Sequence, residues 1–201
     1  AGAAAAALEL CKRGYSVFPC SPSTKRPLTK HGFHDASKDA SQIEMWWRQS
    51  PRALIGLPTG EVNNLLVLDV DTKAGAVDET IEELERECDA RFRGARVATL
   101  HHGRHVYFTD DARIRIGAGR FRPGVDWRGR GGYVIAPDGC RYHLVADGEV
   151  EPAPEPLISM MLRAQAGAPS LALDHGRLSL SYERTISEEV AIECSTVPDE
   201  L

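Results

Sequence analysis

The residues best suited to chemistry are two aspartates that end a short apolar run, LLVLDVD, at positions 65–71. A bounded apolar run of this length is typical of a buried strand, and its period of two places Asp69 and Asp71 on one face. Two ionised carboxylates there repel each other and lose hydration. This costs free energy unless a cation or a basic group offsets it. The pair therefore predicts either a site for a hard divalent cation or two solvated side chains in a turn.

A histidine and a third acid follow this pair along the chain. In HVYF, alternation places His105 and Tyr107 on one face of a predicted strand. Asp126 precedes the glycine-rich sequence GRGG and a further predicted strand at residues 132–136. A lone histidine on a strand is usually a hydrogen-bonded core or edge residue. An imidazole grouped with carboxylates from separate strands would instead suit a site for a divalent metal and a phosphate.

The elements that must position these residues are helices and strands in alternation. Ser41 is predicted to cap a helix with Glu44 at its third position, and an acidic amphipathic helix is predicted to bury Val77, Ile81, Leu84 and Cys88. Further helices are predicted over residues 3–13 and 157–165, and strands over residues 15–20, 53–60, 65–71, 97–100, 105–108 and 132–136.

Composition sets the broad class. The chain has 201 residues, 42% of them hydrophobic and 26% charged, which is ordinary for a globular domain with one substantial core. The apolar start is too short to span a bilayer and lacks a basic leader, so we expect a cytoplasmic protein without a membrane segment. The five cysteines are scattered singly, which predicts neither a disulfide framework nor zinc. The net charge of −5 argues against a uniformly basic surface for nucleic acid.

Taken together, an ordered set of motifs resembles the Prim-Pol domain of the archaeo-eukaryotic primase superfamily, which occurs in replication proteins of plasmids, phages and prophages. The resemblance covers residues 4–144, and the set reads KRPL, HGFHDAS, WW, ALIGLPTG, LLVLDVD, GRHVYF and GVDWRGRGGYVIAP. It implies an α+β catalytic domain over residues 1–150, with an N-terminal αβ module at about 1–60 and an RRM-like module at about 61–150. Residues 151–201 would then be a Pro-rich linker and a C-terminal extension.

The resemblance also implies an activity, which is template-directed nucleotidyl transfer by a DNA primase and DNA polymerase. Asp69, Asp71 and Asp126 match the acids of this family that bind two Mg²⁺ or Mn²⁺ ions, so we expect them to converge. His105 matches the histidine that contacts the triphosphate of the incoming nucleotide. The implied partners are a single-stranded DNA template, nucleoside triphosphates and a replicative helicase.

Basic residues near these motifs are candidates for binding phosphates. Arg104 and Arg128 could hold the nucleotide through bidentate hydrogen bonds, or could be ordinary ion-pair partners. Lys25, which precedes Arg26 and Pro27, is a candidate for template or nucleotide contact. Arg120 and Arg122 are candidates for the path of the single-stranded template.

The chain departs from the family pattern in two places, and other functions stay open. His101 and His102 replace the usual small residues before the histidine motif, so they could narrow the nucleotide pocket or add ligands, and Pro-Asp-Gly replaces a longer loop after Ala136.

The alternative functions are a DxD phosphatase of the haloacid dehalogenase class, a DxD glycosyltransferase, and a primase-like module that binds nucleic acid without catalysis. Lys73 stands where the phosphatase motif has threonine.

Overall fold

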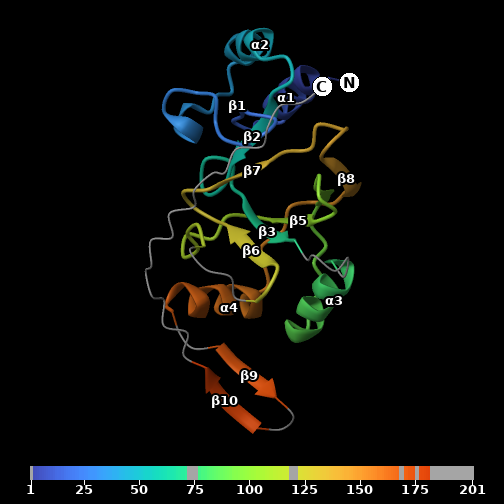
Figure 1. Ribbon diagram of the computed structural model, residues 1–201, viewed down its shortest axis with the longest axis vertical. Helices are drawn as coiled ribbons and strands as arrows, with labels where there is room; N and C mark the ends of the chain where they lie inside the picture. Colours follow the sequence, from blue (N-terminus) through green and yellow to red (C-terminus); the bar gives the residue numbers. More distant parts are fainter. Residues whose placement is uncertain (1, 72–76, 118–121, 168–169, 175–176, 182–201) are drawn as a thin grey trace, which may run out of the picture. The chain divides into compact units, whose positions relative to one another are not determined.

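The computed structural model describes residues 2–71, 77–117, 122–167, 170–174 and 177–181 (Figure 1). The chain divides into two compact units, residues 1–168 and 169–201. In the second unit, β9 (Ser170–Asp174) and β10 (Arg177–Ser181) form an antiparallel hairpin. All the residues discussed below belong to the first unit.

The first unit begins with a small antiparallel sheet and two helices. The sheet has the strand order β1-β2-β7, so a strand from late in the chain completes it. Its elements are α1 (Ala3–Lys12), β1 (Phe18–Cys20), the 3-10 helix η1 (Gly32–Asp35), α2 (Ala40–Gln49), β2 (Leu54–Pro58) and β7 (Tyr133–Ile135). Phe18, Ile43 and Ile55 are fully buried in the core that these elements share. Residues 133–135 thus lie with the N-terminal elements in space, although they follow Asp126 in sequence.

The start of α2 differs from the prediction. Asp39 is the N-cap residue, because its side chain accepts a hydrogen bond of 2.9 Å from the backbone N–H of Ser41. Ser41 therefore lies inside the helix, and Glu44 forms an ion pair with Arg48 instead of closing a capping box. Both residues are good caps, and the extended backbone at Asp39 decides which one is used.

The second sheet has five antiparallel strands in the order β6-β3-β5-β4-β8. Its elements and the helices around it are β3 (Leu66–Val70), α3 (Val77–Glu87), β4 (Arg96–Ala98), β5 (Arg104–Phe108), β6 (Val125–Arg128), β8 (His143–Ala146) and α4 (Glu155–Gln165). The first unit therefore contains two antiparallel sheets, and its α+β class is the one predicted. β6 and β8 are not among the predicted strands, and the exposed residues of β8 show no alternation of apolar and polar side chains.

One face of the five-stranded sheet carries the apolar residues of β3. Leu66, Leu68 and Val70 are fully buried in a second core together with side chains of α3 and α4, both of which lie beside this sheet in Figure 1. The helix predicted at residues 157–165 is α4, and its Leu157 and Met161 are buried in the same core. This packing leaves the opposite face of β3, which carries the aspartates, turned away from the two helices.

Helix α3 confirms the predicted amphipathic pattern with one exception. Val77, Ile81, Leu84 and Cys88 are all buried, as their spacing predicts. Glu85 is buried as well, although it was expected among the outward acids of this helix. Its carboxylate forms ion pairs with Arg91 and Arg96 and accepts a hydrogen bond from the backbone N–H of Phe92. These partners offset the cost of burying the charge.

The other face of the five-stranded sheet is covered over part of its length. Val67, Val97 and Tyr107 belong to the same buried cluster as Phe18 and Ile55 of the small sheet. The polar residues of β3, β5 and β6 follow directly along the strands from this covered region. A boundary between apolar packing and a polar surface therefore lies across the sheet. Among the described residues, no helix has the length and apolar composition to cross a membrane.

Candidate active site

Three of the predicted site residues form a row across the five-stranded sheet. Asp69 on β3 is in register with Asp126 on β6 and with His105 on β5. Residues directly opposite in antiparallel strands point to the same face, with their Cβ atoms about 5 Å apart. The row lies on the face opposite Leu68 and Val70, so the apolar packing of β3 on the helices orients both carboxylates and the imidazole.

A single guanidinium lies close to both carboxylates of the row. Arg128 follows Asp126 by two residues on β6 and therefore shares its face. One of its amino nitrogens is 4.0 Å from Asp69 Oδ2 and 3.7 Å from Asp126 Oδ2. His105 Nε2 lies 3.6 Å from the other oxygen of Asp69. Each carboxylate side chain is 25% exposed, so a solvated ion or substrate can reach it.

Asp71 is an exposed residue directly after β3. Its backbone N–H donates a hydrogen bond of 2.7 Å to the carbonyl of Gly124, which continues the pairing of β3 with β6. The period of two then places its side chain on the face of Asp69. Asp71 is thus the outermost acid, at the solvent end of the strand.

The turn before β5 passes close to the end of β3. A Cβ atom at Gly103 would lie 2.8 Å from the Val70 carbonyl oxygen and 2.8 Å from Thr99 Oγ1, so this position requires glycine. His101 and His102 are exposed in this turn, and His102 has a left-handed backbone with φ of 66°. Neither histidine lines the cavity described next, so they do not narrow it.

A cavity of about 360 Å³ opens where the polar face of the five-stranded sheet meets the small sheet. It includes Lys25, Phe33, Asp69, His105, Arg128 and Tyr133 among its lining residues. Its size falls within the range typical of pockets for small ligands. The cavity brings together one carboxylate, several basic groups and aromatic rings from segments that are far apart in sequence.

Lys25 enters this cavity from the loop after β1. Its backbone is left-handed, with φ of 60°, and its carbonyl accepts a hydrogen bond of 3.2 Å from the hydroxyl of Tyr133. Its ammonium lies 5.8 Å from the centre of the Tyr142 ring, within the range of a cation–π interaction. A strained backbone held by surrounding contacts is a common feature of functional sites.

His105 is 5% exposed. Burial lowers the pKa of its imidazole below the ordinary value, Asp69 opposes this effect, and Arg128 and Lys25 add to it. Its Nδ1 atom is buried and makes no hydrogen bond to the described residues. A buried polar atom without a partner beside a cavity is suited to binding a ligand.

Asp138 organises the loop that brings Tyr142 to the cavity, and sequence reasoning missed both residues. One carboxylate oxygen of Asp138 accepts hydrogen bonds from the backbone N–H groups of Cys140, Arg141 and Tyr142, and the other accepts one from the Arg141 side chain. The signal available was the Pro-Asp-Gly sequence, in which Asp commonly accepts backbone hydrogen bonds in a turn. The tyrosine carried no local signal.

This loop should make stability depend on pH. Burial raises the pKa of Asp138, but the backbone N–H groups and the Arg141 guanidinium outweigh it, so the pKa lies below the ordinary value. Ionised Asp138 therefore contributes stability above its unfolded pKa of about 3.9, and this stability is lost as the pH falls through the lower folded value. We expect Asp138→Asn to lower the free energy of unfolding by about 1–3 kcal/mol at pH 6, and by less below about pH 4.

Denaturant titrations of both proteins across this pH range would measure the difference. Asp147→Asn is the matched control, because Asp147 is exposed in the loop after β8. A difference that stays constant down to pH 3 would contradict the role assigned to the Asp138 carboxylate.

Arg104 and Arg122 do not line the cavity. Arg104 is in register with Val70, which places it on the helix-covered face of the sheet, and its side chain forms an ion pair with Asp78 of α3 at 3.3 Å. Arg122 forms an ion pair with Glu87, also on α3. Arg120 lies outside the described residues. Arg104 is therefore separated from His105 by strand alternation, although the two are adjacent in sequence.

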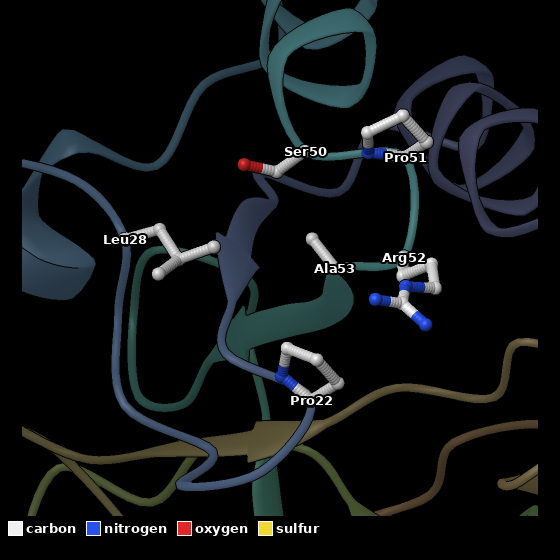
Figure 2. A pocket seen from close by; sticks show the side chains of 6 residues that line it. All are labelled: Pro22, Leu28, Ser50, Pro51, Arg52 and Ala53. Carbon is white, nitrogen blue, oxygen red and sulfur yellow. The ribbon is translucent and has the colours of Figure 1, made fainter.

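A second hollow, of about 310 Å³, lies beside the small sheet (Figure 2). Its lining residues are Pro22, Leu28, Ser50, Pro51, Arg52 and Ala53. They include one charged side chain and neither an acid nor a histidine. This hollow therefore lacks the groups needed for acid–base or metal chemistry, and the cavity at Asp69 is the better candidate.

The donor set at Asp69 suits a hard divalent cation, but the ligands are not gathered around a common point. Among the described residues, no group of three His, Cys, Asp or Glu side chains is arranged to hold a metal ion. The predicted convergence of Asp69, Asp71 and Asp126 is therefore not present as a closed ligand set. Asp69 and Asp126 nevertheless share a face and a register, and both offer exposed carboxylate oxygens of the kind that Mg²⁺ and Mn²⁺ prefer.

Comparison with protein families identifies the family of this chain. The family described as bifunctional DNA primase/polymerase, N-terminal (Prim-Pol), matches residues 7–156. This range contains β3, β5 and β6 and all the residues that form the row and the cavity. A search of curated proteins found no matching protein.

Proposed function

Because this chain belongs to the Prim-Pol family of bifunctional DNA primase/polymerase N-terminal domains, we propose that it transfers nucleotides from nucleoside triphosphates to a primer strand on a DNA template. The observation that supports this most directly is the row of Asp126, Asp69 and His105 at the edge of a cavity that also contains Lys25 and Arg128. Acids and basic groups close together at one cavity suit a reaction in which a triphosphate loses pyrophosphate.

In this proposal Asp69, Asp71 and Asp126 hold two divalent cations. Bound Mg²⁺ or Mn²⁺ would supply Lewis acidity, which lowers the pKa of the primer 3′-hydroxyl and neutralises charge on the α-phosphate. The buried apolar side of β3 fixes the direction of Asp69, because Leu68 and Val70 are locked into the helix-covered core. Asp69 thus sits on a strand anchored in the core, where it can be held in the same place through each turnover.

The basic side of the cavity is proposed to bind the triphosphate. His105 can donate a hydrogen bond to a phosphate oxygen from a ring nitrogen that has no other partner among the described residues. Arg128 and Lys25 also line the cavity, and their positive charges would stabilise the pyrophosphate as it leaves. The Phe33 and Tyr133 rings, whose centres are 6.0 Å apart, offer an apolar surface beside these groups.

We propose that the protein acts in the replication of a mobile element such as a phage or plasmid. It would work in the cytoplasm and beside a helicase. The family resemblance supports this setting, and the single-stranded template would approach the exposed end of β3 at Asp71. The acidic outer face of α3 would repel a phosphate backbone, so the template should avoid that side.

The experiment that tests the function is incubation with a single-stranded template, labelled ATP or dNTPs, and Mg²⁺ or Mn²⁺ separately. Template-dependent products that lengthen with time are the expected result. Free phosphate release without products would favour the phosphatase alternative. Template binding without incorporation would favour an inert binding module. Either of the last two outcomes would contradict the proposal.

A further inference from the structure

The two in-register carboxylates of Asp69 and Asp126 carry a cost that something in the protein must offset. Like charges on neighbouring strands of one face repel each other, and the cost grows as they lose hydration. Arg128 is the cation that the structure places within 4.0 Å of both. It sits between two groups that are proposed as metal ligands, in a position that would oppose a divalent cation.

We propose that Arg128 is an internal counter-ion of Asp69 and Asp126, which a divalent cation must displace, and that the displaced guanidinium then binds the triphosphate. This inference rests on the proposed function, because it takes Asp69 and Asp126 as the metal ligands. Its consequence is that the cation and the nucleotide bind cooperatively. Each of them favours the arrangement in which Arg128 has left the carboxylates.

The contacts of Arg128 are looser than those of other arginines in the same part of the chain. Arg130 is 2.6 Å from Asp110, and Arg113 is 2.8 Å from Glu155, so both make charge-assisted hydrogen bonds. The ion pairs of Arg128 measure 3.7 and 4.0 Å, which is beyond hydrogen-bond distance. Its side chain is 33% exposed and lines the cavity. Arg128 is therefore attracted to the acids without being locked in place.

Thermodynamic linkage determines whether Arg128 strengthens or weakens the binding of the cation. Without nucleotide, Arg128 competes with the cation, so the apparent affinity for the cation is reduced. A bound triphosphate offers Arg128 another partner, and the cation affinity rises. By reciprocity, the cation raises the nucleotide affinity by the same factor. Removing Arg128 should therefore strengthen cation binding in the free protein and weaken the coupling between the two ligands.

Calorimetric titration with Mn²⁺, in the absence and presence of a non-hydrolysable dNTP analogue, tests this directly. In the absence of nucleotide, Arg128→Gln is expected to bind Mn²⁺ about tenfold more tightly than the wild type, the scale expected for removing one charge beside a partly exposed site. The factor by which the analogue strengthens Mn²⁺ binding should shrink about as much. Arg48→Gln is the matched control, because Arg48 is exposed on α2 and the substitution removes the same charge.

A second measurement and a second variant check the expected change in Mn²⁺ affinity. Mn²⁺ should raise the melting temperature of Arg128→Gln more than that of the wild type, because ligand stabilisation follows affinity. Should Arg128→Gln fail to fold, Arg128→Lys is expected to shift Mn²⁺ affinity in the same direction by a smaller factor, since lysine keeps the charge but loses the guanidinium's reach.

Unchanged or weaker Mn²⁺ binding by a folded Arg128 variant would overturn the inference. Asp69→Asn distinguishes this result from a failure of the proposed function. If Asp69→Asn abolishes Mn²⁺ binding while Arg128→Gln leaves it unchanged, only the counter-ion role is lost. If Asp69→Asn binds Mn²⁺ like the wild type, the proposed metal ligands are wrong and both proposals fall.

Discussion

Primer extension by the Asp69→Asn variant is expected to fall roughly 1,000-fold or more, because a catalytic metal supplies several kcal/mol of transition-state stabilisation and each 1.36 kcal/mol is a factor of ten. Asparagine has the shape of aspartate but lacks the charge that holds a divalent cation. Asp69 lies at the centre of the row, in register with both Asp126 and His105, so it has no equivalent neighbour that could replace it.

The fold of this variant should survive. Asp69 makes no contact in the helix-covered core, its side chain is partly exposed, and its loss relieves the repulsion with Asp126. We therefore expect a melting temperature equal to or above that of the wild type in the absence of metal. Time-resolved primer extension with Mg²⁺ and with Mn²⁺ measures the loss, and Asp147→Asn controls for removing one surface charge. Wild-type rates from a folded Asp69→Asn variant would rule out the proposed mechanism.

His105→Ala is expected to raise the KM for the incoming nucleotide about 10- to 100-fold, which corresponds to one hydrogen bond to a charged group worth about 1.5–3 kcal/mol. The reason is the buried Nδ1 atom, which has no partner among the described residues and belongs to a side chain that lines the cavity. The kcat should change less, because the side chain binds the triphosphate in the ground state as well as in the transition state. His105→Gln keeps a hydrogen-bond donor, so its KM should lie between those of the wild type and His105→Ala.

Tyr107→Phe is the matched control for this variant. Tyr107 follows His105 on the same face of β5, and its hydroxyl is likewise buried without a hydrogen-bond partner among the described residues. It does not line the cavity, so its removal should leave the KM unchanged. Steady-state extension of a fixed primer with varied dNTP separates the two parameters. A loss of kcat in His105→Ala at constant KM would contradict nucleotide binding as the role of His105.

The position of Arg104 follows from a local signal in the sequence. Strand alternation, which predicted His105 and Tyr107 on one face, also places their neighbour Arg104 on the other. The structure agrees, because Arg104 pairs with Asp78 on the helix side. By the same rule, Arg128 shares a face with Asp126, two residues earlier. Period-two reasoning was therefore enough to separate the two arginines.

The sequence by itself determined most of the local elements and the direction of their faces. The apolar run before Asp69, the spacing of Ile81 and Leu84 in α3, and the alternation around His105 each follow from interactions within a few residues. Only the tertiary structure decided that β6 and β5 flank β3 in a register that aligns Asp126, Asp69 and His105. Register and strand order depend on packing between segments that are distant along the chain, and no local pattern specifies them. The same holds for Lys25 and Tyr142 at the cavity and for Arg128 between two acids, since each contact is made by residues that meet only when both sheets have formed.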